Sequence, residues 1–140
     1  MELKRVVVTG LGAVTPLGLS AEETWKNMIA GVSGADTIKQ FDASRYKTTF
    51  ACEVKDFDAS KWIDRKEARK MDKFCQFAMA SAAMAIEDSA MDLETIDKKR
   101  VGVIFGVGIG GLKTMQDELE FYSAHKDAPK FGPFFIPKMI

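Results

Sequence analysis

Two short apolar runs, each closed by glycines and followed by a helical pattern, constrain the fold of this chain most. The first run is Val6–Thr9, closed by Gly10 and Gly12, and the second is Val101–Phe105, which leads into Gly106–Gly111. Such runs are typical of buried strands. Because strands that alternate with helices indicate an α/β fold, we expect an α/β fold with both runs as strands.

Capping boxes indicate where the helices begin. The box at Ser20–Glu23 predicts a helix that ends near Gly31, and the box at Asp64–Glu67 predicts one continuous helix to about Ser89. Apolar side chains recur at three- and four-residue spacing along the second helix, at Met71, Phe74, Cys75, Ala78, Met79, Ala82 and Ile86. A third helix is expected along the face formed by Leu112, Met115, Leu119 and Tyr122.

The remaining segments carry weaker signals. Residues 32–48 are polar and turn-like, and Phe50–Val54 is a candidate further strand. Prolines and glycine break regular structure after the third helix, at Pro129, Gly132, Pro133 and Pro137. The final segment, Phe131–Ile140, is apolar, and it indicates either a terminal segment docked on the core or a truncated chain.

Composition excludes several classes of protein. The 140 residues carry 20 basic and 20 acidic side chains, and this balance argues against general nucleic-acid binding. No apolar run is long enough for a membrane span or a signal peptide. Cys52, Cys75 and the single His125 form no metal-ligand pattern and no disulfide framework, so we expect a cytoplasmic protein without a metal site.

Three features allow two interpretations each. The turn Gly106–Gly111 fits the dinucleotide-binding spacing, but no acidic residue is placed at the end of a second predicted strand about twenty positions on, so close backbone packing is the simpler interpretation. Cys75 lies on an apolar stripe without a basic partner, which favours a small buried core residue over a nucleophile. Ile109 lies between glycines and is either a mobile apolar side chain or an ordinary core isoleucine, which the pattern alone favours.

A basic cluster on the second helix is equally open to two interpretations. Lys66, Arg69, Lys70 and Lys73 fall within an arc of about 100° on a continuous helix. They predict either a site for an acidic partner or a solvated charged face.

Four stretches, in order, resemble one family. They are Arg5–Gly18, Asp64–Asp72, Gly106–Leu112 and Pro133–Pro137, and together they are similar to the β-ketoacyl-acyl-carrier-protein synthases, in particular the type II elongation enzymes. The resemblance covers essentially the whole chain. Val107 and Cys75 depart from the family's usual Ser and Thr without a large change in size.

The resemblance implies the N-terminal part of a ketosynthase domain over residues 1–140, with an incomplete thiolase-like αβαβα fold. It implies a homodimer that uses no cofactor and takes acyl and malonyl groups from the phosphopantetheine of acyl carrier protein. The reaction would be a decarboxylative Claisen condensation in fatty acid biosynthesis. The family's catalytic Cys and two His follow the segment that matches Pro133–Pro137, so no catalytic residue is expected here, and this chain alone should be inactive.

The resemblance also implies binding roles for individual residues, and it reverses the interpretations that pattern alone favoured. Those implied to dock the acidic carrier protein are Lys66, Arg69, Lys70 and Lys130. Ile109 matches the gate of the acyl pocket, and Phe135 and Ile136 match residues that line the pocket of the dimer mate. A nucleotide-binding α/β domain and a non-catalytic carrier-binding module remain as alternatives.

Overall fold

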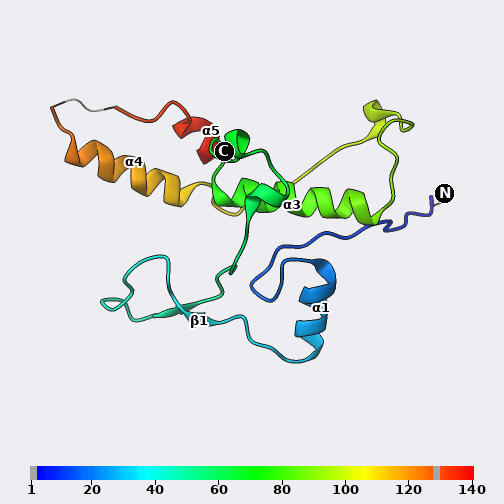
Figure 1. The fold of residues 1–140 in the computed structure, drawn as a ribbon, viewed down its shortest axis with the longest axis horizontal. Helices are drawn as coiled ribbons and strands as arrows, with labels where there is room; N and C mark the ends of the chain where they lie inside the picture. Colours follow the sequence, from blue (N-terminus) through cyan, green and yellow to red (C-terminus); the bar gives the residue numbers. More distant parts are fainter. Residues whose placement is uncertain (1–2, 128–129) are drawn as a thin grey trace. The chain divides into compact units, whose positions relative to one another are not determined.

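The computed structural model describes residues 3–127 and 130–140, which form two compact units. Unit 1 contains the described residues up to Asp58 together with Ser81–Asp92, and unit 2 contains Ala59–Ala80 and Leu93–Ile140. Figure 1 shows the helices and strands along the chain. In chain order they are α1 (Ala21–Ile29), β1 (Asp36–Thr37), β2 (Phe50–Ala51), η1 (Ala59–Lys61), α2 (Arg65–Ala68), α3 (Lys73–Asp88), η2 (Lys98–Arg100), α4 (Leu112–Ala124) and α5 (Phe135–Met139).

Helix α1 begins and ends where the sequence predicts. The Ser20 hydroxyl accepts the backbone N–H of Glu23 at 3.1 Å, and the Glu23 carboxylate accepts the N–H of Leu19 at 2.8 Å. The first of these bonds satisfies a donor that the first helical turn leaves free, and the second fixes the residue that precedes the N-cap. After the helix, Gly31 adopts a left-handed φ of +68°, which glycine tolerates without a steric penalty. The predicted helix is therefore confirmed.

The strand predicted over residues 50–54 is confirmed only at its start. β2 pairs antiparallel with β1, with Asp36 opposite Ala51 and Thr37 opposite Phe50. Beyond these pairs, the backbone N–H groups of residues 39 and 40 donate to the Glu53 carboxylate at 3.1–3.3 Å. A side chain thus takes donors that a longer ladder would have used.

The strands predicted at Val6–Thr9 and Val101–Phe105 are wrong for this structure. Neither run is assigned as a strand, and both are exposed; Val6 is 89% and Ile104 is 95% accessible. A strand requires a hydrogen-bonded neighbour, and within the described residues neither run has one. Their apolar composition is therefore not matched by burial here.

The first glycine turn packs closely against the C-terminal half of α3, within unit 1. A Cβ added at Gly10 would lie 2.2 Å from the Ala85 carbonyl oxygen, and one at Gly12 would lie 2.0 Å from the Ser81 carbonyl oxygen. No side chain fits at those distances. The absence of side chains at Gly10 and Gly12 therefore allows this turn to approach the backbone of α3 closely.

The long helix predicted from Asp64 to about Ser89 is wrong in one respect, because it is broken into α2 and α3. Between them, Met71 N–H bonds to the Ala68 carbonyl three residues earlier, which tightens and ends the turn. The Gln76 amide then donates to the carbonyls of Ala68 at 2.9 Å and Met71 at 3.3 Å. Gln76 therefore adds a side-chain donor to two backbone carbonyls at the break.

Helix α4 is confirmed, whereas the prediction that prolines break all structure after it is wrong. α5 spans Phe135–Met139 with Pro137 at its third position. A proline is tolerated there because the first N–H groups of a helix have no intrahelical partner. The rings of Tyr122 and Phe131 stack at 5.3 Å, and those of Phe131 and Phe135 stack at 4.9 Å, so α5 lies against α4.

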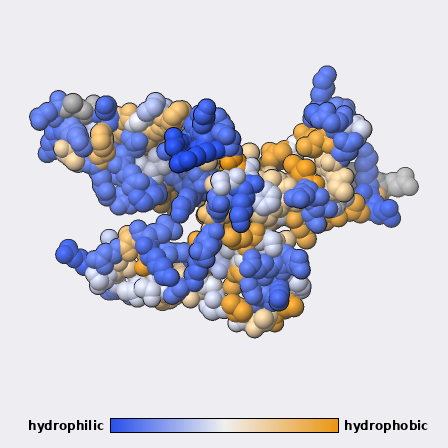
Figure 2. Space-filling model, in the orientation of Figure 1, coloured by the Kyte–Doolittle hydropathy of each residue, from blue (hydrophilic) through white to orange (hydrophobic). Residues whose placement is uncertain are grey.

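Few side chains in the described part of the chain are buried. The apolar residues that reach burial are Ala43, Ile63 and Ala80. Figure 2 accordingly shows hydrophobic side chains at the surface of the molecule. No helix among the described residues is both long and apolar enough to cross a membrane.

Candidate binding site

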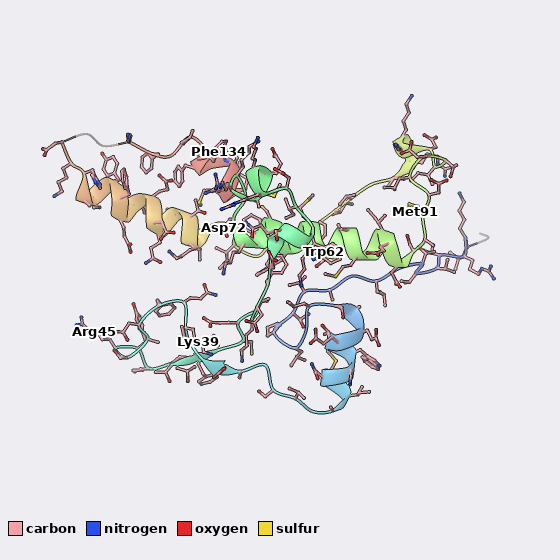
Figure 3. All side chains as sticks on the ribbon, in the orientation of Figure 1. Lys39, Arg45, Trp62, Asp72, Met91 and Phe134 are labelled. Atoms are coloured by element: carbon pink, nitrogen blue, oxygen red, sulfur yellow. The ribbon has the colours of Figure 1, made fainter. Side chains whose placement is uncertain are left out.

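Every site residue that the sequence predicts lies in unit 2, on three segments. The segments are the α2–α3 junction, the glycine turn at residues 106–111, and residues 130–136 at the start of α5. Figure 3 shows the side chains of this unit, with Asp72 and Phe134 labelled.

The basic residues do not share one helix face as the arc argument assumed. Lys66 belongs to α2, Arg69 is its C-cap, Lys70 follows in the turn, and Lys73 begins α3. Lys66 and Arg69 are exposed. Lys70 is half-buried and forms an ion pair with Glu67 at 2.5 Å. The junction therefore presents Lys66 and Arg69 to solvent more openly than Lys70.

Lys130 is exposed on the segment that leads into α5. Two residues later, the Gly132 N–H donates to the Glu118 carboxylate of α4 at 2.7 Å. This bond holds the segment against α4.

Ile109 is 73% exposed, so it is not a core side chain in this structure. The glycine before it, Gly108, has open space where a Cβ would lie, and the one after it, Gly110, has a left-handed φ of +83°. A Cβ at Gly110 would lie 2.7 Å from the Met139 carbonyl, and one at Gly111 would lie 2.3 Å from the Lys138 carbonyl. One end of the turn is therefore open, and the other is packed against α5.

The two predicted pocket residues of α5 have different environments. Phe135 is half-buried, with its ring stacked on Phe131. Ile136 is 61% exposed. Since the glycine turn contacts the backbone of α5, Ile109, Phe135 and Ile136 belong to two segments that pack together.

The sequence pattern did not reveal the role of Asp72. The Asp72 carboxylate accepts the Thr114 hydroxyl at 2.5 Å and the Thr114 backbone N–H at 3.3 Å. These groups are 42 positions apart, and no periodic pattern links them. The only local signal was that α4 begins after Gly111, which has no side chain with which to cap the helix.

The two side chains considered for nucleophilic or metal chemistry lack suitable surroundings. Burial, and to a lesser degree the Asp72 carboxylate, raises the pKa of the half-buried Cys75 thiol, which disfavours the thiolate. His125 is exposed and stacks on Phe121 at 4.1 Å. No group of three or more possible metal ligands gathers in the part of the chain that the structure describes.

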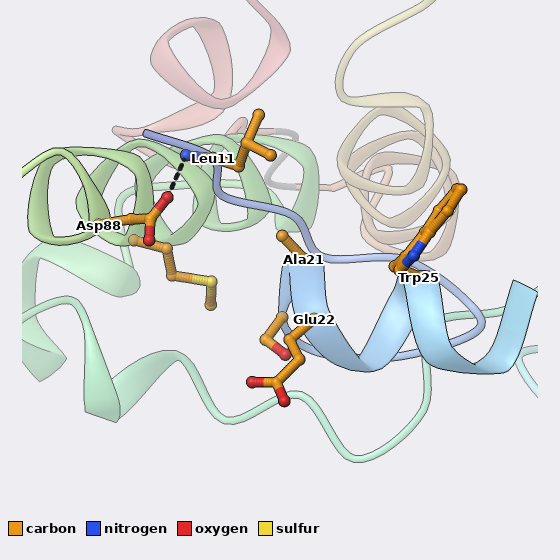
Figure 4. Close-up of a pocket in the computed structure, with 7 residues that line it drawn as sticks. Leu11, Ala21, Glu22, Trp25 and Asp88 are labelled. Carbon is orange, nitrogen blue, oxygen red and sulfur yellow. Dashed lines mark hydrogen bonds between the residues drawn. The ribbon is translucent and has the colours of Figure 1, made fainter. Parts of the chain in front are cut away.

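Unit 1 contains a hollow of about 410 Å³ that involves none of the predicted site residues. Figure 4 shows this hollow beside α1, where the Leu11 N–H donates to the Asp88 carboxylate at 2.8 Å. Its lining consists of Leu11, Ser20, Ala21, Glu22, Trp25, Met84 and Asp88. The neighbouring Gly10 and Gly12 pack against the backbone of α3.

Comparisons with known proteins agree on one family. Residues 3–140 match the family model described as the N-terminal domain of β-ketoacyl synthase. The chain is 44% identical over its full length to 3-oxoacyl-[acyl-carrier-protein] synthase 2 of Synechocystis sp. and 45% identical to that of Coxiella burnetii. It covers 33% and 34% of these proteins, so it spans about a third of the length of the curated relatives it matches.

Solved structures give the same result for the fold. The ishigamide ketosynthase/chain length factor matches 96% of this chain with a TM-score of 0.75 and 27% identity, over 33% of its own length. A type II polyketide ketosynthase, solved in complex with its acyl carrier protein, matches 98% of the chain with a TM-score of 0.74 and 27% identity, over 36% of its length. The chain therefore has the α/β fold of part of a ketosynthase, as the sequence predicted.

Proposed function

Because this chain belongs to the β-ketoacyl synthase family, we propose that the whole protein is a 3-oxoacyl-acyl-carrier-protein synthase of fatty acid biosynthesis. The observation that carries the proposal is the identity of 44–45% to two such synthases along the entire chain. Decarboxylation of malonyl-carrier would yield carbon dioxide and a carbanion. The carbanion would attack an acyl thioester on the enzyme's cysteine, and the cysteine thiolate would leave.

Within this scheme, the described chain supplies binding groups and none of the reacting groups. Lys66, Arg69 and Lys130 are exposed cations suited to an acidic carrier protein, and Lys70 can join them by exchanging Glu67 for the partner. The structurally similar polyketide ketosynthase was solved with its acyl carrier protein bound, which supports a partner of this kind. We place the protein in the cytoplasm, where its free cysteines stay reduced.

The acyl pocket is proposed to lie beside the glycine turn. Ile109 acts as its gate, because Gly108 leaves one side of the backbone unhindered. Phe135 and Ile136 are proposed to line the pocket of the mate in a homodimer, for which the exposed Ile136 side chain offers apolar surface. No cofactor is required by this scheme.

The docking proposal is tested by reversing Lys66, Arg69 and Lys70 to Glu in the whole protein. Exposed ion pairs contribute about 0.2–1 kcal/mol each, so three together give about 1–3 kcal/mol, or up to about a hundredfold in KM for carrier-bound substrate. The kcat should change little, because these contacts exist equally before and during the reaction. Small thioesters without the carrier should react as before.

A matched control is available in η2, where Lys98, Lys99 and Arg100 are three exposed cations in the same unit. Reversing them to Glu changes the net charge equally and should leave KM within about twofold. If both triple variants raise KM alike, only general charge matters and the docking site is refuted. Carrier binding without any condensation would instead favour a non-catalytic carrier-binding module.

The gate is tested by Ile109→Phe. Overpacking of a filled site costs about 1–3 kcal/mol, so rates with long acyl donors should fall by about ten- to a hundredfold, and those with short donors should fall less. The measurement is kcat/KM for a series of acyl-carrier donors. Equal losses at every acyl length would contradict a gate at this position.

A further inference from the structure

Helix α4 lacks a cap of its own and takes one from another segment. Its N-cap is Gly111, which offers no side-chain hydrogen bond, although the first four N–H groups of a helix need acceptors. The Asp72 carboxylate supplies one by accepting the Thr114 N–H at 3.3 Å and the Thr114 hydroxyl at 2.5 Å. A negative charge at this end is also favoured by the helix dipole.

The Asp72 end of these two hydrogen bonds belongs to the junction between α2 and α3. Asp72 directly precedes α3, and Gln76, one turn into that helix, holds the carbonyls of Ala68 and Met71. The backbone around Asp72 is therefore held by side-chain hydrogen bonds across the break between α2 and α3. Arg69 lies three residues before Asp72, within the same short turn.

The first turn of α4, which contains Thr114, is joined to the glycine turn by backbone hydrogen bonds. The Met115 N–H bonds to the Gly111 carbonyl at 2.9 Å, and the Leu112 N–H bonds to the Gly110 carbonyl at 3.0 Å. Ile109 precedes these bonds directly, and Gly108 on its far side has open space around it. The anchored end of the turn therefore leads into the first turn of α4, to which Thr114 belongs, and it also packs against α5.

From these contacts we propose that Asp72 is a positioning residue that caps α4 through Thr114 and thereby fixes the Ile109 turn to the α2–α3 junction. This inference rests on the proposed function, since it assigns Ile109 to the entrance of an acyl pocket. Holding the turn keeps Ile109 across the entrance and disfavours long acyl chains. Loosening it lets Ile109 move aside.

The test compares Thr114→Val with Thr114→Ser in the whole protein. Valine keeps the shape but removes the hydroxyl that Asp72 accepts, whereas serine retains it. The measured quantity is the ratio of kcat/KM for the longest and the shortest acyl-carrier donors that the wild type uses. Loss of a hydrogen bond to a charged group should raise this ratio at least about threefold in Thr114→Val and leave it within about twofold in Thr114→Ser.

An unchanged or lower ratio in Thr114→Val overturns the proposal, and so does an equal loss with both donors, which would show a merely structural role. A second measurement does not depend on activity. Hydrogen exchange of the amides at residues 112–115 should be faster by about tenfold in Asp72→Ala than in the wild type. If the wild type shows no condensation, the proposed function fails, and the exchange result alone decides whether Asp72 caps α4: unchanged protection refutes it.

Discussion

Substitution of Gly12 by alanine should destabilise the protein, because the backbone of α3 occupies the position of the new side chain. The added Cβ would lie 2.0 Å from the Ser81 carbonyl oxygen and 2.7 Å from the Ala85 nitrogen. Favourable contacts of carbon lie at about 3.5–4.0 Å. Gly12 does not have a left-handed backbone, so the substitution adds no backbone strain to the steric conflict.

The magnitude follows from what must move. Both close atoms belong to a helical backbone, so no side-chain rotation can relieve the contact, and the helix must retreat by about 1 Å to reach even a 3.0 Å separation. Overpacking typically costs about 1–3 kcal/mol, and we expect the upper end of that range. Alanine offsets about 0.4–1 kcal/mol of this loss, because it lowers the conformational entropy of the unfolded chain. The net loss is therefore about 2 kcal/mol of the free energy of unfolding.

Urea denaturation of the whole protein measures this loss as a change in the unfolding midpoint at constant slope. The matched control is Gly106→Ala, because Gly106 has nothing within 4 Å of its added Cβ. If Gly12→Ala and Gly106→Ala differ by less than about 0.5 kcal/mol, the close packing of this turn on α3 is refuted.

Two further changes should act in predictable directions. Ala90 has a left-handed φ of +51° just after α3, a conformation that glycine adopts more easily than alanine. Ala90→Gly should therefore stabilise the protein by about 1 kcal/mol in the same urea assay, and a loss of stability would refute this backbone conformation. The hydrogen bond from Lys55, followed by that from the Thr37 N–H, lowers the pKa of the half-buried Asp36 carboxyl below its ordinary value. The stabilising effect of this ionised carboxylate is present above the ordinary carboxyl pKa and is lost as pH falls through the lowered pKa. Lys55→Met should therefore raise the Asp36 pKa in an NMR titration, and an unchanged titration would contradict the ion pair.

Local signals predicted the helix starts well. Ser20 caps α1 as the sequence indicated, and the Asp64 carboxylate accepts the Lys66 N–H at 2.8 Å at the start of α2. Each cap involves residues two or three positions apart, so it can be read without knowledge of the fold. The left-handed Gly31 after α1 is predictable for the same reason.

The break between α2 and α3 was not predictable from periodicity, because the apolar spacing continues through Met71 into α3. What favours the break is a set of side-chain bonds, from Gln76 to two carbonyls at the break and from Thr114 to Asp72. A hydrophobic pattern records which face is apolar, and it carries no information on where the backbone bonds change from one helix to the next.

The apolar runs that end in glycines also show what a sequence pattern cannot predict. Val6–Thr9 has the composition of a buried strand, yet composition encodes only the preference for a pleated, covered environment, and the ladder itself needs donors and acceptors from another segment. Gly10 and Gly12 do make their close backbone contact, because the C-terminal half of α3, on which they pack, lies in the same unit. The packing of these glycines on one neighbouring helix is therefore realised, whereas the strands predicted at Val6–Thr9 and Val101–Phe105, which need adjacent strands, are not.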